Sequence, residues 1–262
     1  MFPAVLKDAK ASEARNVEEA LAALADTEAR LPTLLRRIRR HMTLEPGAPV
    51  LDVGAAQGGY VTALKRAGFD ARGVEPWEPA IVTSREMSKQ TGVETDIVHG
   101  YAEELPYEDG SFDLVIASSV MEHVDDPDQV FREVYRVLRP GGGFYFYTGS
   151  NLSLTQVEIQ GFPLFAWYPD KVRRRIMAWA VEKRPHLVGH TTKPAIHWFS
   201  PRKTPKMLAA AGFQRSIDIY NLVGDDELSG MRLTMTRAAR RNRVARVGAY
   251  MVNGSIAYLA VK

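Results

Sequence analysis

The sequence of 262 residues contains no cysteine. This absence excludes a disulfide scaffold, a cysteine-ligated zinc or iron–sulfur site, and a cysteine nucleophile. Long apolar runs are missing too, because no stretch approaches the ~18 residues that span a membrane. The apolar run near the N-terminus is too short for a signal peptide. We therefore expect a cytoplasmic protein, in keeping with a reducing compartment.

Internal repeats and low-complexity tracts are also lacking, while the overall composition is ordinary. Hydrophobic residues make up 45% of the chain and charged residues 25%, which is typical of a soluble globular protein that fills a core. The length fits one large domain or two small ones.

Charge is unevenly distributed along the chain. The formal net charge is +3, with residues 1–169 holding 16 basic and 25 acidic groups and residues 170–262 holding 18 basic and 6 acidic groups. The two parts therefore carry −9 and +12, which sum to +3. This asymmetry favours an anionic partner for the C-terminal part.

Short apolar segments alternate with helical ones in the first part of the chain. Strands are predicted at 50–54, 70–76, 95–100, 112–118 and 144–149, and helices at 60–69, 79–90 and 127–138. Asp126 is the expected N-cap of the last helix, which Pro140 and the following glycines should end. The alternation predicts a doubly wound, mostly parallel α/β sheet.

The segments on either side of this alternating region differ from it. Residues 12–42 predict one or two helices before a Pro-Gly break, and residues 150–199 form an insertion too long for a plain connection. A helix (200–213), a strand (216–223) and a final strand (255–262) follow. We predict one domain, 1–262, composed of a helical cover (1–45), a cofactor-binding core (46–149), an acceptor-side insertion (150–199) and a C-terminal part with a basic helical insertion (200–262).

A glycine turn follows the first predicted strand, where open α/β sheets bind ligands. Gly54 and Gly58 permit tight turning, and Glu75 lies 21 residues after Gly54, at the end of the next strand. A carboxylate there can accept both hydroxyls of a ribose, which predicts an adenosine-containing ligand. The turn lacks only the middle glycine of the dinucleotide pattern, at Ala56, so a nicotinamide enzyme and a turn that serves packing alone both stay open.

Three longer segments carry a family resemblance. They are VLDVGAAQGGYVTAL (50–64), the block from LPYEDGSFDLV to VLRPGG (105–142), and IHWFSPRKTPKMLAAAGF (196–213). Together they resemble class I S-adenosylmethionine-dependent methyltransferases of the small-molecule and lipid/quinone branch (methyltransferase type 11-like). The resemblance implies S-adenosyl-L-methionine as cofactor. It also implies a Rossmann-like, seven-stranded sheet of order 3-2-1-4-5-7-6 with the last strand antiparallel, N-terminal helices and an inserted lid.

The same resemblance implies roles at matching positions. The methionine portion of the cofactor would be surrounded by Asp52, Gly54 and Gly58, and its ribose would be held by Glu75. The adenine would be bordered by Pro76, Trp77, Tyr101, Ala102 and Glu103. The methyl region would be bordered by Ser118 and Ser119. The sequence departs from the family pattern at Ala56, where a glycine is usual, and at Tyr101, where an aspartate is common.

Methyl transfer is an in-line displacement that depends on positioning, and it requires a base only when the acceptor begins protonated. His123 follows the fourth strand and is the candidate base, or else it only shapes the pocket wall. His190 and His197 are candidate acceptor contacts. No metal site is expected, because Pro185, Gly189 and Pro194 interrupt the helix that metal spacing would need.

The insertion contains an aromatic opening and then a helix within 161–185. We expect Asp170 to cap that helix, and Val172, Ile176, Trp179 and Ala180 to share one face. The helix is interpreted as a lid over the acceptor, as an amphipathic helix with a solvated face, or as a membrane contact anchored by Phe162, Phe165 and Trp167. A second basic segment, 236–248, is a solvated charge run or a site for an anion.

The sequence thus predicts a methyltransferase that acts on an O or N atom of a small or medium organic acceptor, anionic if the basic part binds it. One alternative is a lipid or quinone methyltransferase in peripheral contact with a membrane surface. Another is a non-catalytic S-adenosylmethionine-binding module. Nucleic acid is not the expected partner, since no aromatic-rich binding motif accompanies the basic segments.

Overall fold

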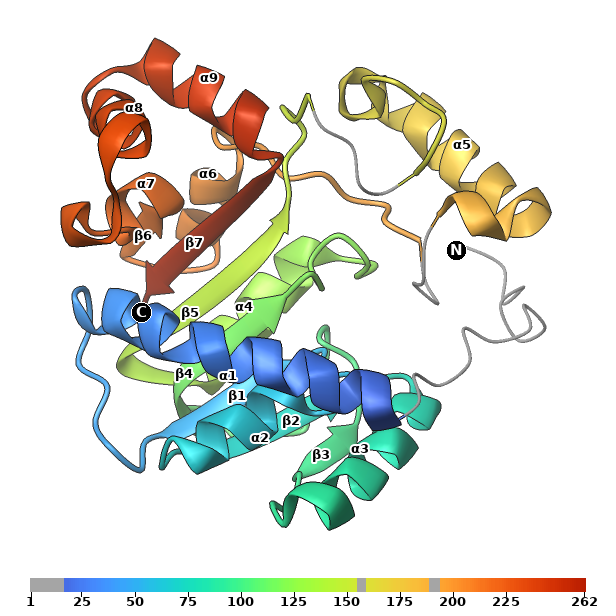
Figure 1. Cartoon of the computed structure of the whole chain (residues 1–262), viewed down its shortest axis with the longest axis vertical. Coiled ribbons are helices and arrows are strands. Elements are labelled where there is room, and N and C mark those ends of the chain that lie inside the picture. Colours follow the sequence, from blue (N-terminus) through green and yellow to red (C-terminus); the bar gives the residue numbers. More distant parts are fainter. Residues whose placement is uncertain (1–16, 155–158, 189–193) are drawn as a thin grey trace.

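The computed structural model describes residues 17–154, 159–188 and 194–262 (Figure 1). Seven strands form one sheet: β1 (Pro49–Val53), β2 (Asp70–Glu75), β3 (Ile97–His99), β4 (Phe112–Ser118), β5 (Leu138–Gly149), β6 (Arg215–Asp218) and β7 (Ser255–Val261). Their order is β3-β2-β1-β4-β5-β7-β6. β7 runs antiparallel to both neighbours, and the remaining pairs are parallel. The predicted fold class, strand order and antiparallel last strand are therefore confirmed.

Helices cover both faces of the sheet (Figure 1). α1 (Val17–Arg39), α2 (Gly59–Arg66) and α3 (Glu78–Thr91) pack together on one face, and α4 (Pro127–Val137) and α6 (Thr204–Ala210) lie on the other. α1 is a single helix through Pro32, because Leu31, Leu34 and Ile38 anchor its buried side on both sides of the proline. Part of the predicted helix, residues 12–16, lies outside the described residues.

Two elements differ from the sequence prediction. β5 begins at Leu138 rather than 144, because a bulge between the Phe112 and Leu114 pairings takes the Pro-Gly-Gly segment into the strand. The strand predicted at 216–223 is wrong in its second half, where α7 (Ile219–Leu222) forms instead. Asp218 ends the strand, since its carboxylate accepts hydrogen bonds from the backbone and side chain of Asn221 at 3.1 and 2.8 Å.

The insertion forms η2 (Phe165–Trp167), α5 (Asp170–Lys183) and η3 (Pro185–Leu187), with a small apolar cluster of its own. The predicted helix is present, but its buried side is Arg173, Met177 and Ala180, whereas Val172 and Trp179 are exposed. Asp170 does not cap the helix; it lies in the first turn and pairs with Arg173.

The predicted helix face is buried only in part, because Ala180 is buried and Ile176 packs against the same cluster. The burial of Arg173 explains why the buried side of the helix turns away from Val172 and Trp179. Its guanidinium lies 4.0 Å from the ring centroid of Trp198 and donates to the Ala166 carbonyl at 3.1 Å. A cation can be buried when an aromatic face and a carbonyl replace its water. Apolarity alone therefore did not identify the buried side.

The C-terminal part supplies η4 (Asp225–Glu227), α8 (Gly230–Arg241) and α9 (Arg243–Asn253) between β6 and β7. The basic segment 236–248 thus lies on two consecutive helices. Arg37 of α1 and Arg40, just after that helix, pair with Glu227 of η4 at N···O distances of 2.7 and 2.6 Å.

Candidate functional site

The loop after β1 occupies the switch point of the sheet, because β2 lies on one side of β1 and β4 on the other. Gly54 has a φ of 71°, and a Cβ there would lie 2.3 Å from the Val120 side chain. Gly58 has a φ of 84° and is the N-cap of α2. Both positions therefore require glycine. The loop is held in place by its own backbone, because the Gly54 and Ala55 amides donate to the Val74 carbonyl at 2.8 and 3.0 Å.

Two carboxyl groups border this loop. Glu75 Oε2 accepts a hydrogen bond from the Ala56 amide at 2.8 Å, and Oε1 accepts one from the Trp77 amide at 2.9 Å. Burial raises the pKa of Glu75 against the lowering effect of these bonds. Asp52 is 3% exposed, and burial together with the nearby Glu75 raises its pKa well above the usual range. Neither carboxyl forms an ion pair with a basic side chain anywhere in the described chain.

This arrangement fits a cationic ligand that carries vicinal hydroxyls. The Glu75 oxygens each retain a lone pair beyond the backbone bonds, so they can still accept from hydroxyl groups. A positively charged ligand would offset the two closely placed acids. Within 17–154, 159–188 and 194–262, no cluster of three or more histidine or acidic side chains could hold a metal ion.

The residues predicted around the adenine follow the C-terminal ends of β2 and β3. Glu75 is in register with His99, and the Gly100 amide donates to the Glu75 carbonyl at 3.3 Å, so residues 75–77 and 99–103 are adjacent. Tyr101 is 59% exposed, whereas Ala102 is buried. Glu103 is held by the Asp125 amide, which donates to its Oε1 at 2.7 Å. The structure therefore brings this predicted group together.

The segment after β4 carries the residues predicted near the methyl group. Ser119 has a φ of 56°, and its amide donates to the Tyr147 carbonyl at 2.8 Å. The His123 ring makes no hydrogen bond within the described chain, and its Nδ1 is buried. Glu122 differs, since its Oε2 accepts from the Thr148 hydroxyl at 2.6 Å. Glu122 is thus a structural partner, whereas no hydrogen bond in the described chain holds the His123 ring.

The predicted acceptor contacts in the insertion have different outcomes. The Ile196 and His197 amides donate to the Glu122 carbonyl at 2.8 and 3.1 Å. The His197 ring lies between Asp125 and α5, with Nε2 3.2 Å from the Asp125 carbonyl and Nδ1 3.4 Å from an Arg174 nitrogen. His197 therefore connects the insertion to the loop after β4. His190 lies outside the described residues.

Sequence reasoning missed a tyrosine group at the same end of the sheet. Tyr60 at the start of α2 lies within hydrogen-bonding reach of Ser118, and burial together with the nearby charge of Asp52 raises the pKa of its hydroxyl. Burial also raises the pKa of Tyr145, and Tyr147 is in register with Ser118. Strand alternation places Tyr145 and Tyr147 on one face, which was the available signal, but only the folded chain places Tyr60 beside them.

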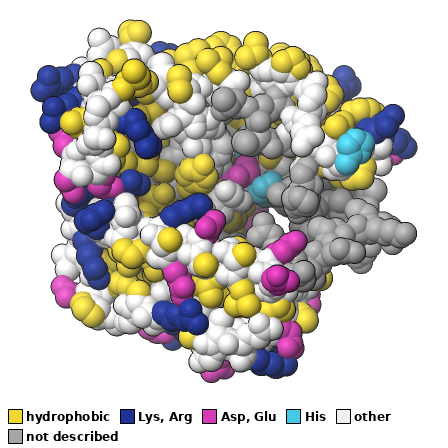
Figure 2. Space-filling view, viewed as in Figure 1, with side chains coloured by type: hydrophobic (Ala, Val, Ile, Leu, Met, Phe, Trp, Pro, Cys, Tyr) yellow, Lys and Arg dark blue, Asp and Glu magenta, His cyan; other side chains and the backbone are white. Residues whose placement is uncertain are grey.

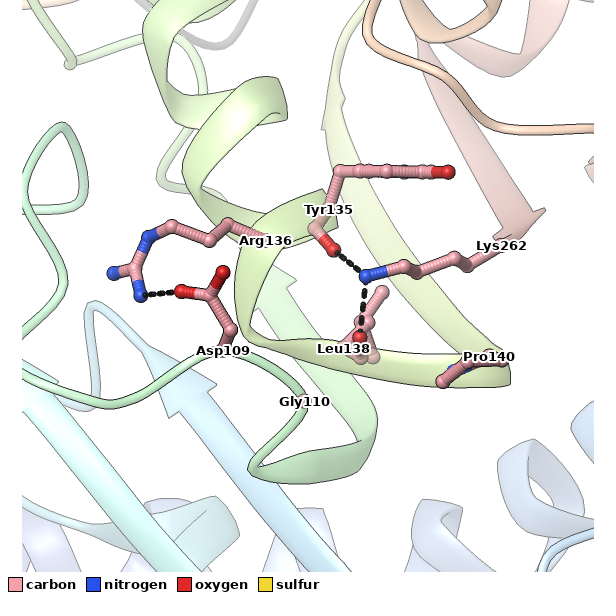
Figure 3. A pocket seen from close by; sticks show the side chains of 7 residues that line it. All are labelled: Asp109, Gly110, Tyr135, Arg136, Leu138, Pro140 and Lys262. Carbon is pink, nitrogen blue, oxygen red and sulfur yellow. Dashed lines mark hydrogen bonds and ion pairs between the residues drawn. The ribbon is translucent and has the colours of Figure 1, made fainter.

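A pocket of about 460 Å³ lies at the opposite ends of the strands (Figure 3). Lys262 Nζ donates there to the Tyr135 and Leu138 carbonyls at 2.6 and 2.7 Å, and Arg136 pairs with Asp109 at 2.9 Å. Lys262 thus satisfies carbonyls at the C-terminal end of α4. Since its charged groups are already paired, this pocket is not the candidate site.

Comparison with known proteins agrees with this geometry. Residues 51–146 match the methyltransferase domain family. The sarcosine/dimethylglycine N-methyltransferase of Halorhodospira halochloris is 35% identical over 126 residues, which are 47% of this chain and 44% of that protein. The ubiquinone biosynthesis O-methyltransferase of Methylococcus capsulatus is 33% identical over 118 residues, 45% of this chain and 49% of that protein. The chain thus spans about half the length of these curated relatives.

The likeness in fold extends over most of the chain. A solved S-adenosylmethionine-dependent methyltransferase from Mesorhizobium loti superimposes with a TM-score of 0.56 at 18% identity, covering 89% of this chain and 98% of that one. No helix in the described part of the chain is long and apolar enough to cross a membrane. The strand order, the glycine loop and the match over residues 51–146 together agree with a class I S-adenosylmethionine-dependent methyltransferase domain in this chain.

Proposed function

We propose that the protein transfers the methyl group of S-adenosylmethionine to an O or N atom of a small or medium organic acceptor. The carrying observation is the pair of buried carboxyls, Asp52 and Glu75, that border the glycine loop without a cationic partner in the described chain. S-adenosylmethionine brings a sulfonium, an ammonium group and two ribose hydroxyls. Its positive charge would pair with the carboxyls, and its hydroxyls would donate hydrogen bonds to them.

In this proposal Glu75 accepts the ribose hydroxyls and Asp52 faces the cationic methionine portion. The residues at 76–77 and 101–103 border the adenine, and Ser118 and Ser119 border the methyl region. The cofactor supplies an activated methyl group when bound. The chain contributes by orienting the acceptor and excluding water, which is the larger part of catalysis in a displacement of this kind.

His123 is the proposed base for an acceptor that begins protonated. Its ring has no hydrogen bond in the described chain, whereas a histidine that only supports the wall would be expected to satisfy its buried nitrogen. The ring can therefore take the acceptor's proton as the bond to the methyl group forms.

The insertion is the proposed cover of the acceptor. It reaches the loop after β4 through the backbone of residues 196–197 and the His197 ring, so it lies beside the proposed base. Two relatives act, by name, on an amine and in ubiquinone biosynthesis. Each matches under half of this chain, so we assign the acceptor only by class. The exposed Leu164, Trp167 and Trp179 favour the quinone or lipid alternative, but Phe165 is fully buried and cannot serve as the anchor predicted from sequence.

Calorimetric titration tests the cofactor. We expect S-adenosylmethionine and S-adenosylhomocysteine to bind and NAD not to bind. Glu75→Gln should weaken binding about 10- to 100-fold, because charge-assisted hydrogen bonds to the ribose are lost. Glu108→Gln, an exposed acid away from the loop, is the matched control. Binding of NAD alone, or an affinity of Glu75→Gln within twofold of the parent, would contradict the assignment.

His123→Asn tests the base separately from the cofactor. Turnover with an acceptor found by labelled methyl transfer to metabolite extracts should fall about 10²- to 10⁴-fold. The dissociation constant for S-adenosylhomocysteine should stay unchanged. Normal turnover would remove His123 from the base role and leave the cofactor assignment intact. Bound cofactor with no transfer to any acceptor would favour the non-catalytic module.

A further inference from the structure

The helices α8 and α9 attach to the fold through a small apolar contact and two arginines. Ala239 and Tyr250 are fully buried in the main core. Beside them Arg240 donates to Asp225 and to the carbonyls of Tyr220 and Val223, and Arg246 pairs with Asp218 at 3.4 Å. The inward arginines are therefore used to attach the two helices to the rest of the fold.

The outer side of the same helices carries four exposed apolar side chains. Met231 and Met235 of α8 are 78% and 44% exposed, and Val244 and Val252 of α9 are 80% and 62% exposed. The two residues on each helix are four or eight positions apart, so each pair lies on one face. Figure 2 shows hydrophobic side chains gathered along the upper edge of the molecule, over α9, with basic side chains over α8.

Unpaired arginines flank this apolar surface. Residues 230–253 contain six arginines and no aspartate, glutamate or lysine. Four of the six are exposed, and one of these, Arg237, pairs with Asp225. The structure gives the other three, Arg232, Arg241 and Arg243, no hydrogen bond or ion pair in the described chain. We call this combination of four apolar and three basic side chains the α8–α9 surface.

We propose that the α8–α9 surface docks onto the anionic surface of a lipid bilayer. Shallow apolar side chains beside unpaired arginines match the interface between acyl chains and anionic headgroups. A second copy of the chain is a poor occupant, because a two-fold contact would face arginines with arginines and supply no acid from either helix pair. Docking at this surface does not require that the chain transfers methyl groups.

One end of the docked face lies beside the start of the insertion. The Ser150 amide donates to the Gly254 carbonyl at 3.2 Å, and the Leu154 amide donates to the Met251 carbonyl at 2.9 Å. The end of α9 is thus joined to the end of β5, where the insertion begins, and α9 and α5 both lie along the upper edge of Figure 1. A bilayer bound to α8 and α9 would therefore be close to the acceptor side.

Co-sedimentation of the full chain with vesicles tests the docking. We expect binding to vesicles of phosphatidylcholine mixed with phosphatidylglycerol and little binding to vesicles of phosphatidylcholine alone. Salt should release the protein, since the Debye length falls from about 30 Å at 0.01 M to about 8 Å at 0.15 M ionic strength. Arg241→Glu/Arg243→Glu should lower the partition coefficient by about 25-fold or more, at roughly fivefold for each arginine near the surface. Met231→Ser/Val244→Ser should weaken binding at low salt and leave a more salt-sensitive remainder.

The matched control is Arg85→Glu/Lys206→Glu, which makes the same change in net charge at exposed positions on α3 and α6. It should bind vesicles within about twofold to threefold of the parent, and all variants should unfold at the same temperature. No binding to anionic vesicles at low salt, or an equal loss in the control, would overturn the proposal. Retained S-adenosylhomocysteine binding in either case shows that the proposed function has not failed with it.

Discussion

The glycine loop and the C-terminal part of the chain differ in whether their charged side chains have partners of opposite charge. At the glycine loop, two buried carboxyls stand close together without a basic partner in the described chain. In the C-terminal part, the buried carboxyl of Glu227 is matched by Arg37 and Arg40, and Asp225 by Arg237 and Arg240. Unbalanced charge thus coincides with the candidate site, and balanced charge with attachment between elements.

This difference has a physical basis. An unpaired buried charge lowers stability unless a ligand completes it, whereas a paired one holds two segments in a defined position. The asymmetry of −9 and +12 along the sequence is therefore not one electrostatic feature. It combines an acidic binding site, a set of internal ion pairs and the exposed arginines of the α8–α9 surface.

The largest expected effect on stability comes from removing a paired carboxyl in the C-terminal part. Glu227→Ala should lower the free energy of unfolding by about 2–3 kcal/mol, below the ~3–5 kcal/mol of a fully buried pair, because Arg37 and Arg40 are 24% and 30% exposed. Denaturant unfolding measures it. Asp226→Ala is the control, since its side chain is 62% exposed, and should change stability by less than about 1 kcal/mol.

The effect of Glu227→Ala should be confined to stability. Cofactor affinity, measured on folded protein, should match that of the parent because Glu227 belongs to the attachment of η4 to α1. A loss of affinity larger than the loss from Asp226→Ala, at equal folded fraction, would contradict the division between attachment and site.

A smaller effect of opposite sign on the free energy of unfolding is expected at the glycine loop. Asp52→Asn should raise the free energy of unfolding by about 1 kcal/mol at pH 8, because it removes a buried carboxylate with no basic partner, and should weaken cofactor binding at least about tenfold. The pKa of Asp52 is raised in the folded state, so the folded chain binds more protons than the unfolded one. Stability of the parent therefore falls as pH rises from the ordinary carboxyl pKa through the raised one.

The pH dependence separates this effect from a packing change. The stability gain of Asp52→Asn should be small at pH 4, where the carboxyl is protonated in the folded chain, and should grow toward pH 8. Thermal unfolding at a series of pH values measures it. A gain that is independent of pH would show that charge is not its cause, and a loss at pH 8 would show that Asp52 has a basic partner in solution.

The sequence predicted the strands around the glycine loop because each of them is encoded by a short, continuous segment of the chain. Each strand near the loop is an apolar run bounded by turn residues, and Gly54, Gly58 and Glu75 stand at the ends of those runs. Contacts between distant segments escaped it. The burial of Arg173 depends on Trp198, and the end of β6 on the side chain of Asp218. The place of Tyr60 beside Ser118 depends on α2 crossing to the end of β4.

The smallest expected effect concerns the departure from the family pattern at Ala56. Its φ is 47°, a conformation that costs a residue with a Cβ about 1–2 kcal/mol. Ala56→Gly relieves this strain but adds about 0.5–1 kcal/mol of backbone entropy to the unfolded chain. We therefore expect a net gain in the free energy of unfolding of about 0.5 kcal/mol, measured in urea.

Gly47→Ala provides the calibration for that small effect. Gly47 has a φ of 78° and nothing within 4 Å of a Cβ, and it lies outside the loop. Gly47→Ala therefore combines the same strain and the same change in backbone entropy in the opposite direction, and it should destabilise by about 0.5 kcal/mol. Because Ala56 holds Glu75 through its amide rather than its side chain, Ala56→Gly should leave cofactor affinity within about threefold of the parent. A larger change would mean that the methyl group of Ala56, and not only the backbone of the loop, contributes to the unbalanced end.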